Sequence, residues 1–146
     1  MLANGRRLAA FALLACFFLP LSKCTSSSQG GAPMDDYRFP FEHVTQAVDD
    51  FQEQGTLLTD SLPLLLVTLV VFLAPIAVLK LGTTFQSIAH IVLAAPAEWL
   101  LYEWSTIGQM QIGGVLAMLS WAVLFVVGAF TLWKKLSHQE TIDPKQ

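Results

Sequence analysis

The sequence predicts an all-α membrane protein with about three transmembrane helices after an N-terminal signal, plus one short amphipathic external helix. Three observations lead to this prediction: an apolar composition, two long apolar segments, and a shorter apolar segment behind two arginines. The 146 residues are 54% hydrophobic and only 13% charged, about half the charged fraction of a typical soluble domain. A water-soluble fold this small could not cover so much apolar surface, so lipid is the expected solvent.

Residues 1–23 have the pattern of a secretory signal peptide. Arg6 and Arg7 form a positive start, and residues 8–21 are almost wholly apolar. As a helix this run measures about 21 Å, which is short of the roughly 30 Å hydrocarbon core of a bilayer. A short apolar run behind positive charge, followed by small polar residues, favours a removable signal over a membrane span.

The residues that end this segment resemble a bacterial lipoprotein box, in which a cysteine is acylated and becomes the mature N-terminus. They read Leu-Ser-Lys-Cys over 21–24, and the resemblance implies that Cys24 is the lipid-attachment site and that residues 24–40 form a flexible tether. Lys23 departs from the pattern, because a small residue is usual there, and Cys16 matches that position better. The alternative is that Cys24 is an ordinary thiol beside a cleavage site or an uncleaved first span.

Residues 41–61 form an acidic external segment that includes an amphipathic helix. Between 25 and 61 the chain has seven acidic residues and one basic residue, Arg38. Helices that lie on membranes usually carry basic residues on their polar face, so we expect this helix to dock on a partner or on the chain's own spans. The acidic face is expected to be solvated. The apolar positions that repeat at helical spacing are Phe41, Val44, Val48 and Phe51.

Two segments, 62–81 and 112–133, are long and apolar enough to be membrane spans. Pro75 lies inside the first and is expected to kink it, because proline has no N–H to donate and its ring clashes with the preceding turn. Gly113 and Ala117 in the second have the spacing of small residues that lets another helix, from this chain or a partner, approach closely.

The distribution of lysines decides how residues 85–104 are interpreted. If this segment also crosses, Lys80, Lys134 and Lys135 all lie in the cytoplasm, as the positive-inside rule favours. We therefore predict a three-helix membrane domain over 62–135, in an inner membrane. Residues 25–61 are then periplasmic or extracellular, and the tail 136–146 is cytoplasmic.

The middle segment also contains the candidate polar site, formed by Gln86, His90 and Glu98. Ionisable residues inside a membrane are functional candidates, and a histidine can carry protons or bind metal. The simpler interpretation is hydrogen bonding to a neighbouring helix, and we favour it. Accordingly, no metal and no cofactor are expected.

We expect a small bacterial inner-membrane protein that is an accessory, assembly or scaffolding subunit of a membrane complex. Catalysis is not expected, because the sequence holds no nucleophile-elbow, Walker or zinc motif. Without a basic patch and interleaved aromatics, nucleic-acid binding is not expected either. The expected partners are membrane lipid and another membrane protein or a second copy of the chain. The alternative function is an oligomeric pore or proton/ion carrier that uses the polar residues of the middle span.

Overall fold

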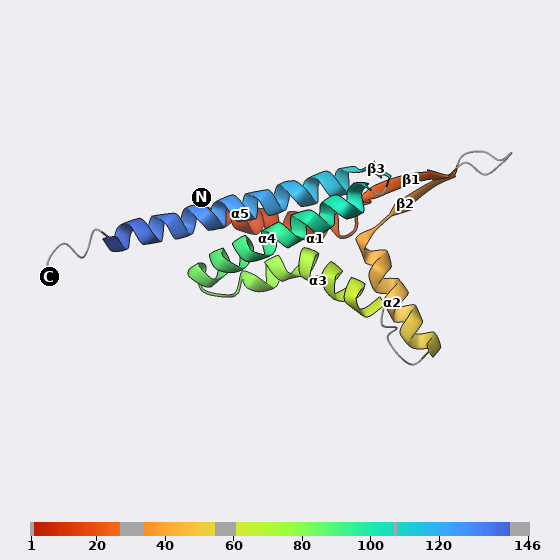
Figure 1. Cartoon of the computed structure of the whole chain (residues 1–146). Coiled ribbons are helices and arrows are strands. Elements are labelled where there is room, and N and C mark those ends of the chain that lie inside the picture. Colours follow the sequence, from red (N-terminus) through yellow and green to blue (C-terminus); the bar gives the residue numbers. More distant parts are fainter. Residues whose placement is uncertain (1, 27–33, 55–60, 107, 141–146) are drawn as a thin grey trace.

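The computed structural model describes residues 2–26, 34–54, 61–106 and 108–140 (Figure 1). The described chain is mostly helical, as predicted, and it adds a small antiparallel sheet that was not predicted. The elements are α1 (Leu2–Cys16), β1 (Ser22–Ser26), β2 (Met34–Arg38), α2 (Pro40–Gln54), α3 (Ser61–Val78), α4 (Thr83–Thr106), β3 (Gln109–Met110) and α5 (Ile112–Glu140).

Four helices form the bundle, in which α1, α4 and α5 run side by side and α3 lies along α4 (Figure 1). The core between them is apolar, and its largest fully buried side chains include Leu13 of α1, Phe72 of α3 and Trp121 of α5. The N-terminal segment therefore contributes to the core. Its removal would take away one wall of the bundle.

The sheet lies at one end of the bundle, with β1 in the centre and strand order β2-β1-β3. Ser22 pairs with Arg38 on one side and with Met110 on the other. The described residues at both ends of the expected tether, 24–26 and 34–38, are thus in strands. Their pairing was not visible in the sequence, because each strand is short and polar.

The amphipathic helix predicted after residue 40 is present as α2. Pro40 occupies its first position, where the missing N–H costs nothing. The Glu42 carboxylate accepts a hydrogen bond from the backbone N–H of Phe39 at 2.9 Å, which is half of a capping box. The apolar side of α2 packs on α3 and buries Ala47, whereas Val48 stays 48% exposed. Docking on the chain's own helices, one of the two expected arrangements, is therefore observed.

Three transmembrane helices are more than the structure shows. Among the described residues one helix, Ile112–Ser137, is long and apolar enough to cross a membrane. The apolar part of α3, Leu62–Val78, is shorter. α4 has 24 residues and is long enough, but its polar side chains keep it from being apolar enough.

Pro75 lies inside α3 as predicted, and a neighbouring helix compensates for its missing N–H. In a regular helix the carbonyl of Val71 would accept from residue 75, four positions on. Instead, Trp121 of α5 donates its indole N–H to that carbonyl at 3.2 Å. Membrane helices tolerate interior proline when neighbouring groups satisfy the freed carbonyl in this way.

Candidate functional site

The polar centre of the bundle is organised by Arg6 of α1, a residue that the sequence marked only as part of a signal. Its guanidinium donates to Gln86 Oε1 at 3.0 Å and to Ser87 Oγ at 2.9 Å, both on α4. It also donates to Thr131 Oγ1 on α5 at 2.8 Å. Arg6 is only 5% exposed. One side chain thus joins three helices, and we call these four residues the Arg6 cluster.

Each acceptor in the Arg6 cluster is itself tied to backbone. The Gln86 amide donates to the carbonyls of Leu79 and Leu81 at 2.8 and 2.6 Å, which are among the unpaired carbonyls after α3. The hydroxyl groups of Ser87 and Thr131 each donate to the carbonyl four residues earlier in their own helix. Gln86 is therefore a structural link between α1, α4 and the α3–α4 turn.

His90 lies one turn further along α4 and is fully buried. Its ring faces the carbonyl of Pro75, but neither ring nitrogen has a hydrogen-bond partner within the described structure. Gln86 and His90 are both buried and point into the bundle. Glu98 is half-buried and makes no hydrogen bond or ion pair with described residues, so it does not join them.

The described side chains contain no group of three or more His, Cys, Asp or Glu residues that could hold a metal ion. The buried polar residues are an arginine, an amide, an imidazole and hydroxyl groups. The Arg6 cluster contains no carboxylate to balance the guanidinium. Its chemistry is that of a hydrogen-bonded clamp between helices.

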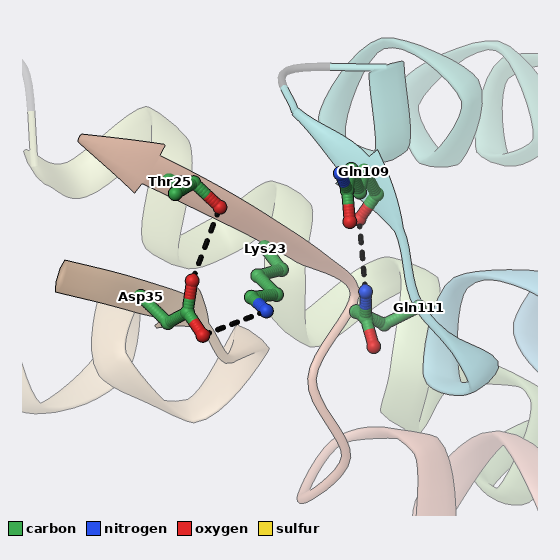
Figure 2. A network of polar contacts seen from close by, with 5 residues as sticks. All are labelled: Lys23, Thr25, Asp35, Gln109 and Gln111. Carbon is green, nitrogen blue, oxygen red and sulfur yellow. Dashed lines mark hydrogen bonds and ion pairs between the residues drawn. The ribbon is translucent and has the colours of Figure 1, made fainter. Parts of the chain in front are cut away.

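Cys24, the expected lipid-attachment residue, lies in the middle of β1 opposite Asp36. Beside it, Lys23 forms an ion pair with Asp35 at 2.7 Å, and Thr25 donates to the same carboxylate at 3.1 Å (Figure 2). The hydrogen bond to Asp35 raises the pKa of Lys23. The same contact, with that of Thr25, lowers the pKa of Asp35. Acylation of Cys24 stays a prediction.

Figure 2 also shows how the third strand leads into α5: the Gln111 amide donates to the carbonyl of Gln109 at 3.3 Å. Gly108, just before, adopts φ +113°. An added Cβ there would lie 2.5 Å from the carbonyl oxygen of Lys23, so only glycine fits without displacement. This turn fixes β3 against β1.

The described structure has a small pocket and an apolar groove. The pocket, of about 160 Å³, lies where the sheet meets α2 and α4, and Arg38, His43 and Trp104 line it. Burial lowers the pKa of His43, Glu42 partly offsets this, and Arg38 lowers it further. An apolar groove of about 320 Å³ separates α3 from α4 above Trp121. Nothing in the structure shows what fills either one.

Comparisons with protein-family models, with curated proteins and with solved structures found no match.

Proposed function

We propose that the protein is a small inner-membrane protein that acts as an accessory, assembly or scaffolding subunit and catalyses no reaction. The observation that carries this proposal is the contrast between its interior and its surface. Inside, Gln86 and Ser87 are used in hydrogen bonds within the chain. Outside, α5 exposes large apolar side chains along its length. These include Leu119, Val126, Phe130 and Trp133.

The same contrast supports a placement of the bundle in a membrane. We propose that α3, α4 and α5 cross the bilayer, with the sheet and α2 outside and the lysines inside. α4 contains several polar residues, but two of them, Gln86 and His90, are buried while Ile88 and Val92 face outward. Lipid would meet the apolar side. A hydrogen bond of 2.7 Å from Lys135 to Thr84 holds the end of α5 beside the start of α4, as an inward crossing of α5 requires.

The proposed docking element is α2, which the fold holds outside the membrane domain. It packs only part of its apolar stripe on α3, since Val48 remains half exposed, and its acidic residues Glu42 and Asp49 face solvent. A partner that covers Val48 would bury apolar area and meet negative charge.

The test compares two charge-adding variants on α2. Extraction in mild detergent and native mass analysis should show the chain in a complex larger than its own 16.0 kDa. Val48→Lys should release it, whereas Gln46→Lys, which adds the same charge at another exposed position, should leave the complex intact. A lone monomer in several gentle detergents contradicts the proposal.

The second candidate, an oligomeric pore or proton/ion carrier, is favoured by one observation: His90 is buried, and neither ring nitrogen has a hydrogen-bond partner among the described residues. In that case purified protein in vesicles leaks protons and His90→Ala abolishes the leak. Conductance equal to empty vesicles removes this candidate and leaves the scaffolding proposal untouched.

A further inference from the structure

We infer that α1 is not a removable signal but a retained fourth membrane helix, locked in place by Arg6, with Cys24 left in mid-chain. This inference rests on the membrane placement proposed above for α3, α4 and α5. It concerns the processing of the chain, which that placement does not decide.

The first support is that α1 has two apolar sides. One side is buried against α5 and α3 and includes Ala10, Leu13 and Cys16, all 1% exposed or less. The other presents Leu8 and Phe11, which are more than half exposed. A helix between protein and lipid needs both sides apolar. Burial alone decides little here, because lipid tails are about as apolar as a protein core.

The polar contacts of Arg6 weigh more. A buried guanidinium beside lipid is costly unless its N–H groups are satisfied, so Arg6 needs hydrogen-bond partners. Gln86, Ser87 and Thr131 supply three acceptors at 2.8–3.0 Å. Removal of α1 would withdraw the guanidinium that all three face. A signal peptide has no need of such contacts with helices that begin more than 50 residues later.

The segment that leaves α1 is also built into the fold. Gly113 of α5 lies so close to it that an added Cβ would come within 2.5 Å of the Pro20 carbonyl oxygen. The carbonyl of Leu21 accepts a hydrogen bond from Gln111 N–H at 2.9 Å. The small surface at Gly113, expected to receive another helix, is thus occupied by residues 19–20 of the same chain.

Cleavage before Cys24 would cut β1 after its second residue. Ser22 and Lys23 provide both residue pairs with β3, and Lys23 forms the ion pair with Asp35. Loss of residues 1–23 would therefore abolish the pairing of β1 with β3. Acylation as a new N-terminus requires that cut.

Charge agrees with a fourth span, and the length is close to what a span needs. α1 has 15 residues, and backbone hydrogen bonds continue the turns as far as Leu19, which gives about 27 Å, the first turns with Arg6 and Arg7 included, against the roughly 30 Å hydrocarbon core. Arg6 and Arg7 lie at the end of the bundle where Thr131 and the lysines lie. With α1 included, the helices alternate in direction and all these bases fall on the inner side.

The experiment measures the intact mass of the chain, purified through a C-terminal tag from a bacterial host. We expect a mass that includes residues 2–23. The Cys24→Ala variant should also keep these residues. A mass lacking residues 1–23, with or without acyl chains, overturns the inference and leaves the three-span placement standing.

Two further measurements separate retention from membrane crossing. In a background with Cys16→Ala and Cys24→Ala, Ala3→Cys should react with a membrane-impermeant maleimide only after lysis. Labelling on intact cells overturns the fourth span. Arg6→Gln should lower the unfolding temperature by several degrees, whereas Arg7→Gln, at the exposed neighbour, should not. If both substitutions lower the unfolding temperature equally, Arg6 does not hold α1 in the bundle.

Discussion

At the scale of single residues, Pro75 of α3 and the indole of Trp121 act together. Proline removes a hydrogen bond that the helix would otherwise make, and the indole N–H restores it from another helix. The energetic value of Trp121 therefore depends on residue 75. This dependence can be measured.

Trp121→Phe should destabilise the protein by on the order of 1 kcal/mol, because the buried Val71 carbonyl loses the indole N–H that donates to it. In a Pro75→Ala background the cost of the missing N–H should shrink, since the backbone N–H of residue 75 can then bond to Val71. A double-mutant cycle compares the free energies of unfolding of the wild type, both single variants and the double variant. If the effects of the two substitutions add strictly, the indole does not compensate for the proline.

The Lys23–Asp35 pair predicts a pH dependence in the sheet. The lowered pKa of Asp35 means that the pair stabilises the fold above about pH 4, the usual value for aspartate, and that this is lost as pH falls through the lowered folded value. The raised pKa of Lys23 sets the upper limit, with loss above about pH 10. The difference in unfolding midpoint between wild type and Asp35→Asn should thus be present at pH 7.

At pH 3 that difference should be smaller, and the neighbouring Asp36→Asn serves as the control. Asp36 faces away from Lys23 on the strand. The difference in unfolding midpoint between wild type and Asp36→Asn should therefore not show the pH dependence expected for Asp35→Asn. The effect is small in either case, because exposed ion pairs contribute little. If the difference in unfolding midpoint between wild type and Asp35→Asn is the same at pH 3 and pH 7, the pair with Lys23 is not the cause of the pH dependence.

At the scale of elements, the sheet depends on the turn at Gly108. Its φ of +113° lies in the region that residues with a Cβ rarely adopt, and the Lys23 carbonyl leaves no room for one. Short strands without a continuous apolar pattern are not specified by periodicity. Here the turn and the α1–β1 connection hold them in register.

Gly108→Ala should therefore destabilise the fold by about 1 kcal/mol or more and weaken the pairing of β1 with β3. Gly5→Ala in α1 is the matched control, because nothing lies within 4 Å of the added Cβ and alanine favours a helix by roughly 0.5–1 kcal/mol over glycine. Thermal unfolding compares them. Equal destabilisation by both substitutions contradicts the role of the turn.

At the scale of the whole molecule, the bundle buries an apolar core together with the Arg6 cluster and exposes large apolar side chains along α5. The sequence predicted the mostly helical structure, and the segments it singled out correspond to the described helices. Placement of the bundle in a membrane stays a prediction. The sequence also found Gln86 and His90 as polar residues that face neighbouring helices. It did not find Arg6, because an arginine near the N-terminus is equally typical of a signal peptide.

The orientation of the bundle gives a prediction for intact cells. With the native cysteines replaced, Gln52→Cys on α2 should react with a membrane-impermeant maleimide from outside. Leu136→Cys, at the exposed end of α5, should react only after lysis. Reaction of both from outside contradicts the crossing of α5, independently of the fate of α1.

The sequence by itself determined the apolar segments, the place of the interior proline and the amphipathic α2, because each depends on the chemistry and spacing of residues close together in the chain. Only the tertiary structure decided what surrounds Arg6, which strands pair, and what covers Gly113. Those contacts join residues 80 to 125 positions apart at Arg6 and Gln111 to Leu21 beside Gly113. Local patterns carry no record of such partners, so a helix locked into a bundle and a removable signal look alike until the chain is folded.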